Sequence, residues 1–190
     1  VVQGIFSCTV GSSDEILISR ANAACTLQKC CARASTSVKT HMVMQAGDLD
    51  ALTPQTKTLI FSSYRRIDED SRHRGYFALE TPSGGDMDNL HFAESLRSRC
   101  PNAQLIMINA CYSADICAKL RSAYAGRVAT IGWGSAILET DATKFEVALF
   151  LELEATNSFS RPSSMSLQVA LDRAYATLKG GTRSLHDLPQ

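Results

Sequence analysis

The stretch Gln104-Leu-Ile-Met-Ile-Asn-Ala-Cys-Tyr-Ser113 decides the fold class of this chain. Residues 105–108 are continuously apolar without alternation, which is typical of a strand covered on both faces of a parallel sheet. Cys111 follows this strand, and a helix is expected directly afterwards, over 114–124. A buried strand that runs straight into a helix favours a βαβ arrangement.

The rest of the chain alternates strands and helices in the same way. Expected strands cover 1–10, 38–45, 58–61, 75–79 and 127–133, and expected helices end near Arg33, Arg99, Glu154 and Lys179. The first helix, capped by Ser12, should bury one face made of Ile16, Leu17, Ala21, Ala24, Leu27 and Cys31. The second should begin after Asp86 or Asp88 and turn inward Leu90, Phe92, Ala93 and Leu96. We therefore expect an α/β fold, a three-layer αβα sandwich with a mostly parallel sheet.

Length and composition fit one globular domain over residues 1–190. The chain has 45% hydrophobic residues and a formal net charge of zero, so it offers no basic field for nucleic acid. Its longest apolar stretch is about one strand long, which predicts no membrane span. Because the sequence opens with Val1 and not Met, it could be a domain excised from a longer chain.

The cysteine pattern predicts reduced thiols and a cytoplasmic protein. The seven cysteines are odd in number, without repeated spacing, and no histidine lies near them at zinc-ligand spacing. We therefore expect no disulfide framework and no metal. The pair Gly132-x-Gly134 lacks the rest of a dinucleotide-binding motif, so no cofactor is expected either.

Two strand ends are candidate sites, because chemistry in parallel sheets gathers beyond the carboxyl ends of the strands. The 58–61 strand leads into Ser63-Tyr64-Arg65, and the 104–110 strand leads into Cys111. A cysteine just before a helix lies near the positive helix N-terminus, which favours the nucleophilic thiolate. From position alone, Cys111 could equally be a small residue at a tight junction.

The segment 105–115 resembles the nucleophile strand of caspase-like (clan CD) cysteine peptidases, especially the CHAT branch. In that branch a hydrophobic strand ends in Ala-Cys, any residue, Ser, as Ala110 to Ser113 do here. The segments 128–145, 150–153 and 170–174 are similar to the family in order and spacing. The resemblance covers roughly residues 36–180 and implies a caspase-like sandwich with Cys111 as the nucleophile.

The chain departs from this family at the catalytic base. Family members follow the earlier strand with His-Gly, where this chain has Tyr64-Arg65. Tyrosine is protonated and a poor base at neutral pH. His73, in the following charged loop, is a candidate base that could equally be a solvated surface residue. His41 and His91 are not better bases.

Substrate contacts are predicted at Ser63, Asn109 and Trp133. Asn109 stands where metacaspases place an acid that reads basic substrate side chains, so a preference for Arg or Lys is unsupported.

Two functional hypotheses follow from the resemblance and the departure. The first is a catalytically impaired pseudopeptidase that acts as a protein-interaction or regulatory module. The alternative is an active cysteine endopeptidase with Cys111 as nucleophile and His73 or a partner-supplied group as base. A redox-sensing thiol at Cys111 is a third reading. The expected partner is a protein or peptide, and a homodimer or a larger multidomain chain is suggested only by analogy.

Overall fold

Among the residues that the structure describes, the sheet has five strands and is parallel throughout. The computed structural model describes residues 1–6, 14–41, 46–62, 88–159 and 162–179. The strands are β1 Val2–Phe6, β2 Val38–His41, β3 Thr58–Ser62, β4 Leu105–Asn109 and β5 Ala129–Ile131. Their order across the sheet is β2-β1-β3-β4-β5, and every neighbouring pair is parallel.

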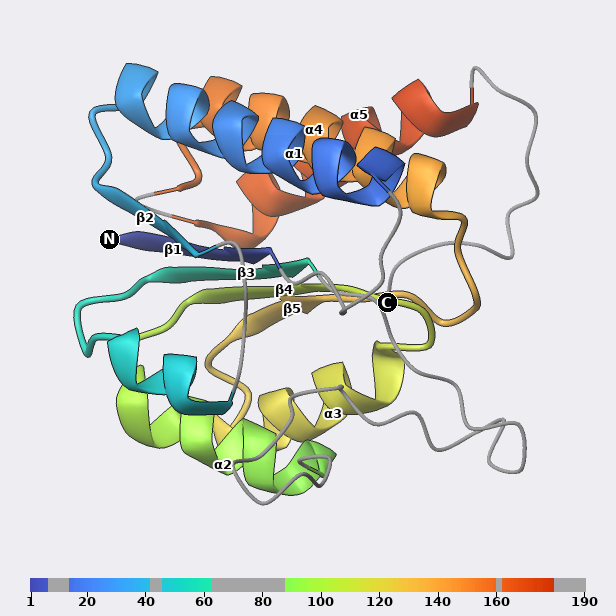
Figure 1. The fold of residues 1–190 in the computed structure, drawn as a ribbon. Coiled ribbons are helices and arrows are strands. Elements are labelled where there is room, and N and C mark those ends of the chain that lie inside the picture. The colour runs from blue at the N-terminus through green and yellow to red at the C-terminus, as the bar shows by residue number, and fades with distance from the viewer. Residues whose placement is uncertain (7–13, 42–45, 63–87, 160–161, 180–190) are drawn as a thin grey trace.

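Helices cover both faces of this sheet. They are α1 Asp14–Arg33, α2 Asn89–Arg99, α3 Ala114–Ala123, α4 Glu139–Ala155 and α5 Ser164–Lys179, with a 3-10 helix η1 at Ala46–Ala51. Helices α1, α4 and α5 pack together on one face, and α2 packs with α3 on the other (Figure 1). The expected three-layer αβα sandwich is therefore confirmed. The expected strand at 75–79 lies outside the described residues.

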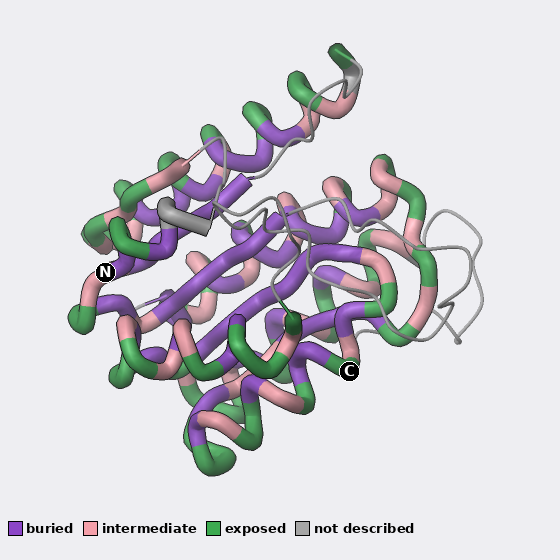
Figure 2. Tube along the Cα trace, turned by 60° about the horizontal axis from the view of Figure 1, so that its bottom comes forward, coloured by how far each residue is buried: buried purple, intermediate pink, exposed green. Residues whose placement is uncertain are grey.

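Strand β4 lies at the centre of two apolar cores, one on each side of the sheet. Ile106 and Ile108 belong to the core under α2 and α3, whereas Leu105 and Met107 belong to the core under α1, α4 and α5. Figure 2 shows the strands buried between helices whose outer faces are exposed. This double burial explains why the strand is apolar at successive positions.

The buried face of α1 differs from the expected one. Leu17 is 44% exposed and Ala21 is exposed, so their prediction as core residues is wrong. The buried stripe includes the predicted Ala24, Leu27 and Cys31, and it also contains Arg20, Ala23 and Cys30. The reason is that Arg20 takes a place in the interior, four residues before Ala24, and thereby fixes the rotation of the helix about its axis.

Helix α2 begins as predicted at Asp88, whose carboxylate Oδ1 accepts the backbone N–H groups of Leu90 and His91, both at 2.9 Å. Leu90 was expected inside the core, but its side chain is 54% exposed. It lies in the first helical turn, ahead of the buried positions Phe92 and Ala93.

Strand β5 is shorter than the predicted 127–133. It pairs with β4 only at residues 129–131, because the chain then leaves the sheet at Gly132 to contact the residues that follow β4. No helix in the described part of the chain is both long and apolar enough to cross a bilayer.

The buried cysteines should resist alkylation in the native protein. Cys30, Cys31, Cys100 and Cys117 are free thiols with no exposed surface. Burial raises the pKa of Cys30 to about 11 and that of Cys117 to about 12, so little reactive thiolate forms at pH 8. Peptide mapping after iodoacetamide treatment at pH 8 should find exposed Cys25 modified and these four modified only in urea. Rapid native labelling of Cys117 would contradict the packing described.

Candidate functional site

Cys111 lies just beyond the carboxyl end of β4, an inner strand of the sheet, and three residues before α3 begins. Its side chain is partly buried. The Sγ atom is 3.4 Å from the backbone N of Ile137, which donates to it, and 3.4 Å from the carbonyl O of Ile137, which can accept the thiol proton. The thiol is therefore held by the backbone of a segment that follows β5.

That segment, residues 133–137, is hereafter called the strap. Its backbone runs along the residues that follow β4 and bonds to them repeatedly. The N–H of Ala114 donates to Trp133 O and the N–H of Tyr112 donates to Ser135 O, both at 3.0 Å. With the contact at Cys111, these bonds close the strap over the candidate thiol.

The Ser113 hydroxyl forms two hydrogen bonds that join the end of β4 to the start of the strap. Its hydroxyl donates to Ile108 O at 2.9 Å and accepts the N–H of Trp133 at 2.8 Å. Gly132 passes so close that a Cβ there would lie 2.6 Å from Cys117 Sγ and 2.9 Å from Ser113 Oγ. Only glycine fits without displacing these atoms, which explains the residue at this position.

Backbone strain marks the turn between β4 and α3. Tyr112 has φ +51°, in the left-handed region that a non-glycine residue rarely adopts. Such strain persists when the surroundings fix the conformation, and here the bond from Tyr112 N to Ser135 O does so.

A buried polar cluster lies between α1, α4 and the carboxyl ends of β3 and β4. The Arg20 guanidinium is 1% exposed and its Nη2 lies 2.9 Å from Glu139 Oε2. Its Nη1 donates to Ser62 Oγ and lies 3.7 Å from Oε2 of Glu146, a residue with no exposed surface. One cation therefore faces two carboxylates.

Glu146 is the most constrained member of this cluster. Its Oε2 accepts from Ser62 Oγ at 2.8 Å and from Asn109 Nδ2 at 3.2 Å. Its Oε1 has no hydrogen-bond partner among the described residues. Burial raises the pKa of Glu146 to about 7, while Arg20 and these two hydrogen bonds lower it and Glu139 raises it further.

Asn109 connects the cluster to the strap. Its Oδ1 accepts the indole N–H of Trp133 at 2.8 Å, and its Nδ2 also donates to Ala142 O at 3.2 Å. The Trp133 ring packs edge-on against Phe145, with the ring centroids 5.1 Å apart. Asn109 and Trp133, predicted to contact substrate, are each 1% exposed, so neither side chain is open to a ligand here. What the structure assigns to both is a place in the hydrogen-bond network that joins the strap to the buried cluster.

The remaining predicted site residues, Ser63, Tyr64, Arg65 and His73, lie outside the described residues. Of the histidines that the structure describes, His41 ends β2, three strands away from β4 in the sheet and thus about 14 Å distant.

His91 lies in the first turn of α2, with an exposed side chain. Within the described ranges, no group of His, Cys, Asp and Glu side chains is arranged to hold a metal ion.

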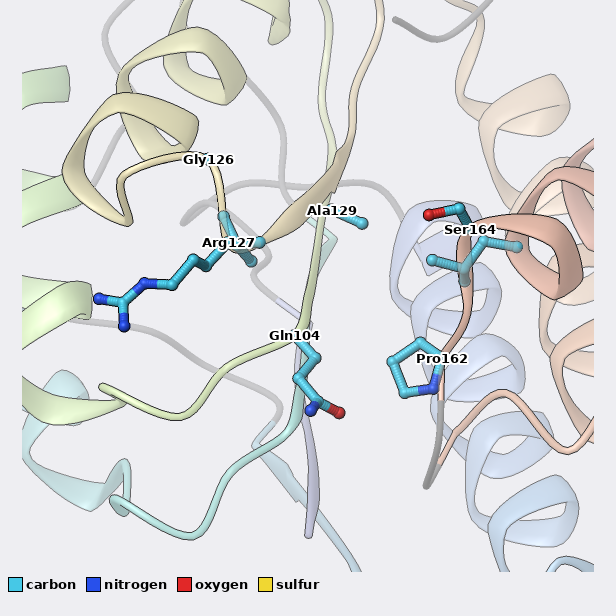
Figure 3. A pocket seen from close by; sticks show the side chains of 8 residues that line it. Gln104, Gly126, Arg127, Ala129, Pro162 and Ser164 are labelled. Carbon is cyan, nitrogen blue, oxygen red and sulfur yellow. The ribbon is translucent and has the colours of Figure 1, made fainter.

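A separate pocket of about 310 Å³ lies at the amino ends of β4 and β5, at the other end of the strands from Cys111. It is lined by Gln104 and Val128, which precede β4 and β5, and by residues of α5 such as Ser164 and Leu167. Figure 3 shows the Arg127 side chain extending away from Pro162 and Ser164. The pocket therefore lies about 20 Å along β4 from Cys111 and takes no part in that site.

Comparison with protein-family models and with curated proteins finds no match for this chain.

Sequence reasoning missed Arg20, Glu139, Glu146 and Ser62. A usable signal was present, because Arg20 stands at a helical step from Ile16 and Ala24, and Glu146 stands four residues after Ala142 and four before Phe150. A charged residue at a position where the helix face is otherwise apolar indicates a buried, paired charge.

Replacing Gly132 by alanine should destabilise the protein. The added methyl would overlap Cys117 Sγ and Ser113 Oγ, and overpacking of this kind costs about 1–3 kcal/mol. Urea unfolding should show this loss in the free energy of unfolding. The same Gly132→Ala change made in the Cys117→Ala variant should cost less, because the Sγ atom that the methyl would overlap is absent there. Unchanged stability of Gly132→Ala would contradict the close approach at this junction.

Ionisation of Glu146 should lower stability between about pH 4.5 and 7. The pKa of about 7 in the folded state exceeds the ordinary 4.5, so the folded protein binds more protons and its unfolding free energy falls as pH rises through this window. The loss amounts to about 3 kcal/mol. Glu146→Gln should remove this dependence in urea unfolding followed across pH.

The matched control is Glu152→Gln, which alters a carboxylate on the same helix that pairs with Arg173 at the surface. If Glu146→Gln and the wild type lose stability in parallel from pH 4.5 to 7, the buried carboxyl does not titrate as described.

Proposed function

We propose that this chain is a caspase-like domain that has lost peptidase activity and works as a protein-interaction or regulatory module through the surface around Cys111. The observation that carries the proposal is the pairing of strands at this edge. Ser62 of β3 pairs in register with Asn109 of β4. Two residues further along each segment, the sequence has Tyr64 on one side and Cys111 on the other.

A cysteine peptidase needs a base within hydrogen-bond reach of its thiol, and histidine serves best near neutral pH. The sequence offers tyrosine and arginine after β3, where caspase-like peptidases have His-Gly. His41 is too distant to substitute. These facts support an impaired thiol, whereas the partly exposed Cys111 and its strap support a site that still meets a partner.

The expected partner is an extended peptide or a protein segment, which is the class of ligand that the resemblance to caspase-like cysteine peptidases implies for the surface around Cys111. The free thiols of the six described cysteines support a reducing compartment such as the cytoplasm.

One observation favours the alternative, an active cysteine endopeptidase. Cys111 lies beyond the carboxyl end of β4, three residues before α3, where parallel sheets place their chemistry, and its side chain is partly exposed. In this alternative His73 or a partner supplies the base. His73→Ala should then abolish turnover that depends on Cys111.

The wild-type chain should cleave no peptide in a Cys111-dependent manner. A proteome-derived peptide library is incubated with the wild type and with Cys111→Ala, and new N-termini are counted by mass spectrometry. Equal counts support the proposal. Cleavage that disappears in Cys111→Ala would overturn it in favour of the endopeptidase.

Introducing the family's His-Gly in place of Tyr64-Arg65 should make the Cys111 thiol more reactive. Tyr64→His/Arg65→Gly should increase Cys111 labelling by a peptidyl acyloxymethyl ketone at least about tenfold, since a positioned base accelerates such chemistry by two orders of magnitude or more. The same double variant in Cys111→Ala is the control. Labelling no faster than in the wild type would argue against a caspase-like arrangement of these two segments.

The interaction role has its own test. A display library of extended peptides is panned against Cys111→Ala, and enriched peptides are added to the wild type with iodoacetamide. They should slow modification of Cys111 and leave exposed Cys25 unaffected. Enriched peptides that never protect Cys111 would rule out recognition at this edge.

A further inference from the structure

The Cys111 site is connected to the buried cluster through an unbroken series of contacts. Glu146 Oε2 accepts from Asn109 Nδ2 at 3.2 Å, and Asn109 Oδ1 accepts from Trp133 Nε1 at 2.8 Å. Trp133 is the first residue of the strap, and Ile137, its last, contacts Cys111 Sγ at 3.4 Å. The backbone of residues 134–136 joins the two ends of the strap.

We infer that Glu146, Asn109 and Trp133 are positioning residues for Cys111, and that the charge on the buried Glu146 carboxyl controls how firmly the strap closes over the thiol. This inference deepens the proposed function, on which it rests for the importance of Cys111. It adds regulation by pH to that site. The effect is measured as the alkylation rate of Cys111, which needs neither a substrate nor a partner.

The charge balance of the cluster explains why Glu146 is the responsive group. Arg20, on α1, is nearest to Glu139, whose Oε2 lies 2.9 Å away, against 3.7 Å for Glu146. A second ionised carboxylate in this dry interior leaves the cluster with excess negative charge. The Glu139 side chain retains 24% exposure and so keeps contact with solvent, whereas the Glu146 side chain has no exposed surface.

The other elements packed on α4 supply no further charge to Glu146. From β3 and β4 it meets the neutral groups of Ser62 and Asn109. Helix α5 also packs on α4, but its Arg173 pairs with Glu152 at 3.3 Å. Arg20 is therefore the one cation that the described residues bring to Glu146.

Opening the strap relieves the cost of ionising Glu146. If Trp133 withdraws, Asn109 loses its indole partner, and the network around the Glu146 carboxylate can exchange buried contacts for water. The closed state has the raised pKa of about 7 and a hydrated carboxylate returns towards 4.5, so rising pH favours the open state by linkage. Cys111 should then become more accessible as Glu146 ionises.

The test compares Cys111 alkylation in the wild type and in Glu146→Gln from pH 5 to 9, with iodoacetamide and peptide mass mapping. Dividing the two rates removes the thiol's own ionisation. The ratio should be near one at pH 5 and at least about threefold by pH 8.5, because the Glu146 carboxyl ionises between these two values. Cys25 in the same molecule and the variant Glu152→Gln are the controls.

Two further variants separate positioning from general stability. Trp133→Phe keeps an aromatic ring but removes the N–H that bonds to Asn109, so the pH step at Cys111 should shrink while the Glu146-dependent step in stability remains. Glu139→Gln removes the repulsion that raises the Glu146 pKa and should move the step to lower pH.

A rate ratio that stays flat from pH 5 to 9 would overturn the inference. An unchanged pH-dependent rise of Cys111 alkylation in Trp133→Phe would also overturn it. The effect of Glu146 would then reach Cys111 without the hydrogen bond between Trp133 and Asn109. Neither result bears on whether Cys111 cleaves peptides or binds a partner, which the experiments on the proposed function decide.

Discussion

The burial of one guanidinium between two carboxylates organises this molecule. Arg20 brings α1 to Glu139 and Glu146 of α4, and through Ser62 it reaches the end of β3. A buried arginine left without its partners would cost several kcal/mol, so both helices and the strand end must keep their relative positions. The apolar cores fill the space around this arrangement, while the polar contacts specify it.

The same cluster determines what happens at the edge where Cys111 lies. Asn109 is the last residue of β4 and uses both ends of its amide, one toward Glu146 and one toward the Trp133 indole. Trp133 in turn begins the strap that Ile137 closes on the thiol. The candidate site is therefore an extension of the buried network, and its geometry depends on a carboxyl group with no direct contact to sulfur.

The fold could be predicted from the sequence because periodicity and burial agree along most of it. The unbroken apolar run of β4 requires helices on both faces, and the structure has them. Two of the errors fell where a polar interaction overrode periodicity. Arg20 displaced Leu17 and Ala21 from the core face of α1, and β5 ended early because the chain leaves the sheet at Gly132 and the Trp133 N–H donates to Ser113 Oγ.

The candidate site was only partly predictable. Cys111 could be singled out because a cysteine after a buried parallel strand stands at the edge where such sheets place their chemistry. The strap could not, since backbone N–H groups of Trp133 and Ile137 make these contacts with residues 20 and 26 positions away, and backbone groups carry no sequence signal. Asn109 and Trp133 were identified as important residues, yet the structure assigns them a buried hydrogen bond to each other in place of an exposed surface.

Carbon-13 labelling of the glutamate carboxyl groups, followed by NMR across pH 3 to 9, tests the central claim most directly. Glu146→Gln assigns the resonance of interest, and the account predicts that this one titrates with a midpoint near 7. A Glu146 resonance that titrates near the ordinary value of 4.5 would show that the carboxyl is neither buried nor crowded by Glu139 as described, and the coupling to Cys111 would lose its physical basis.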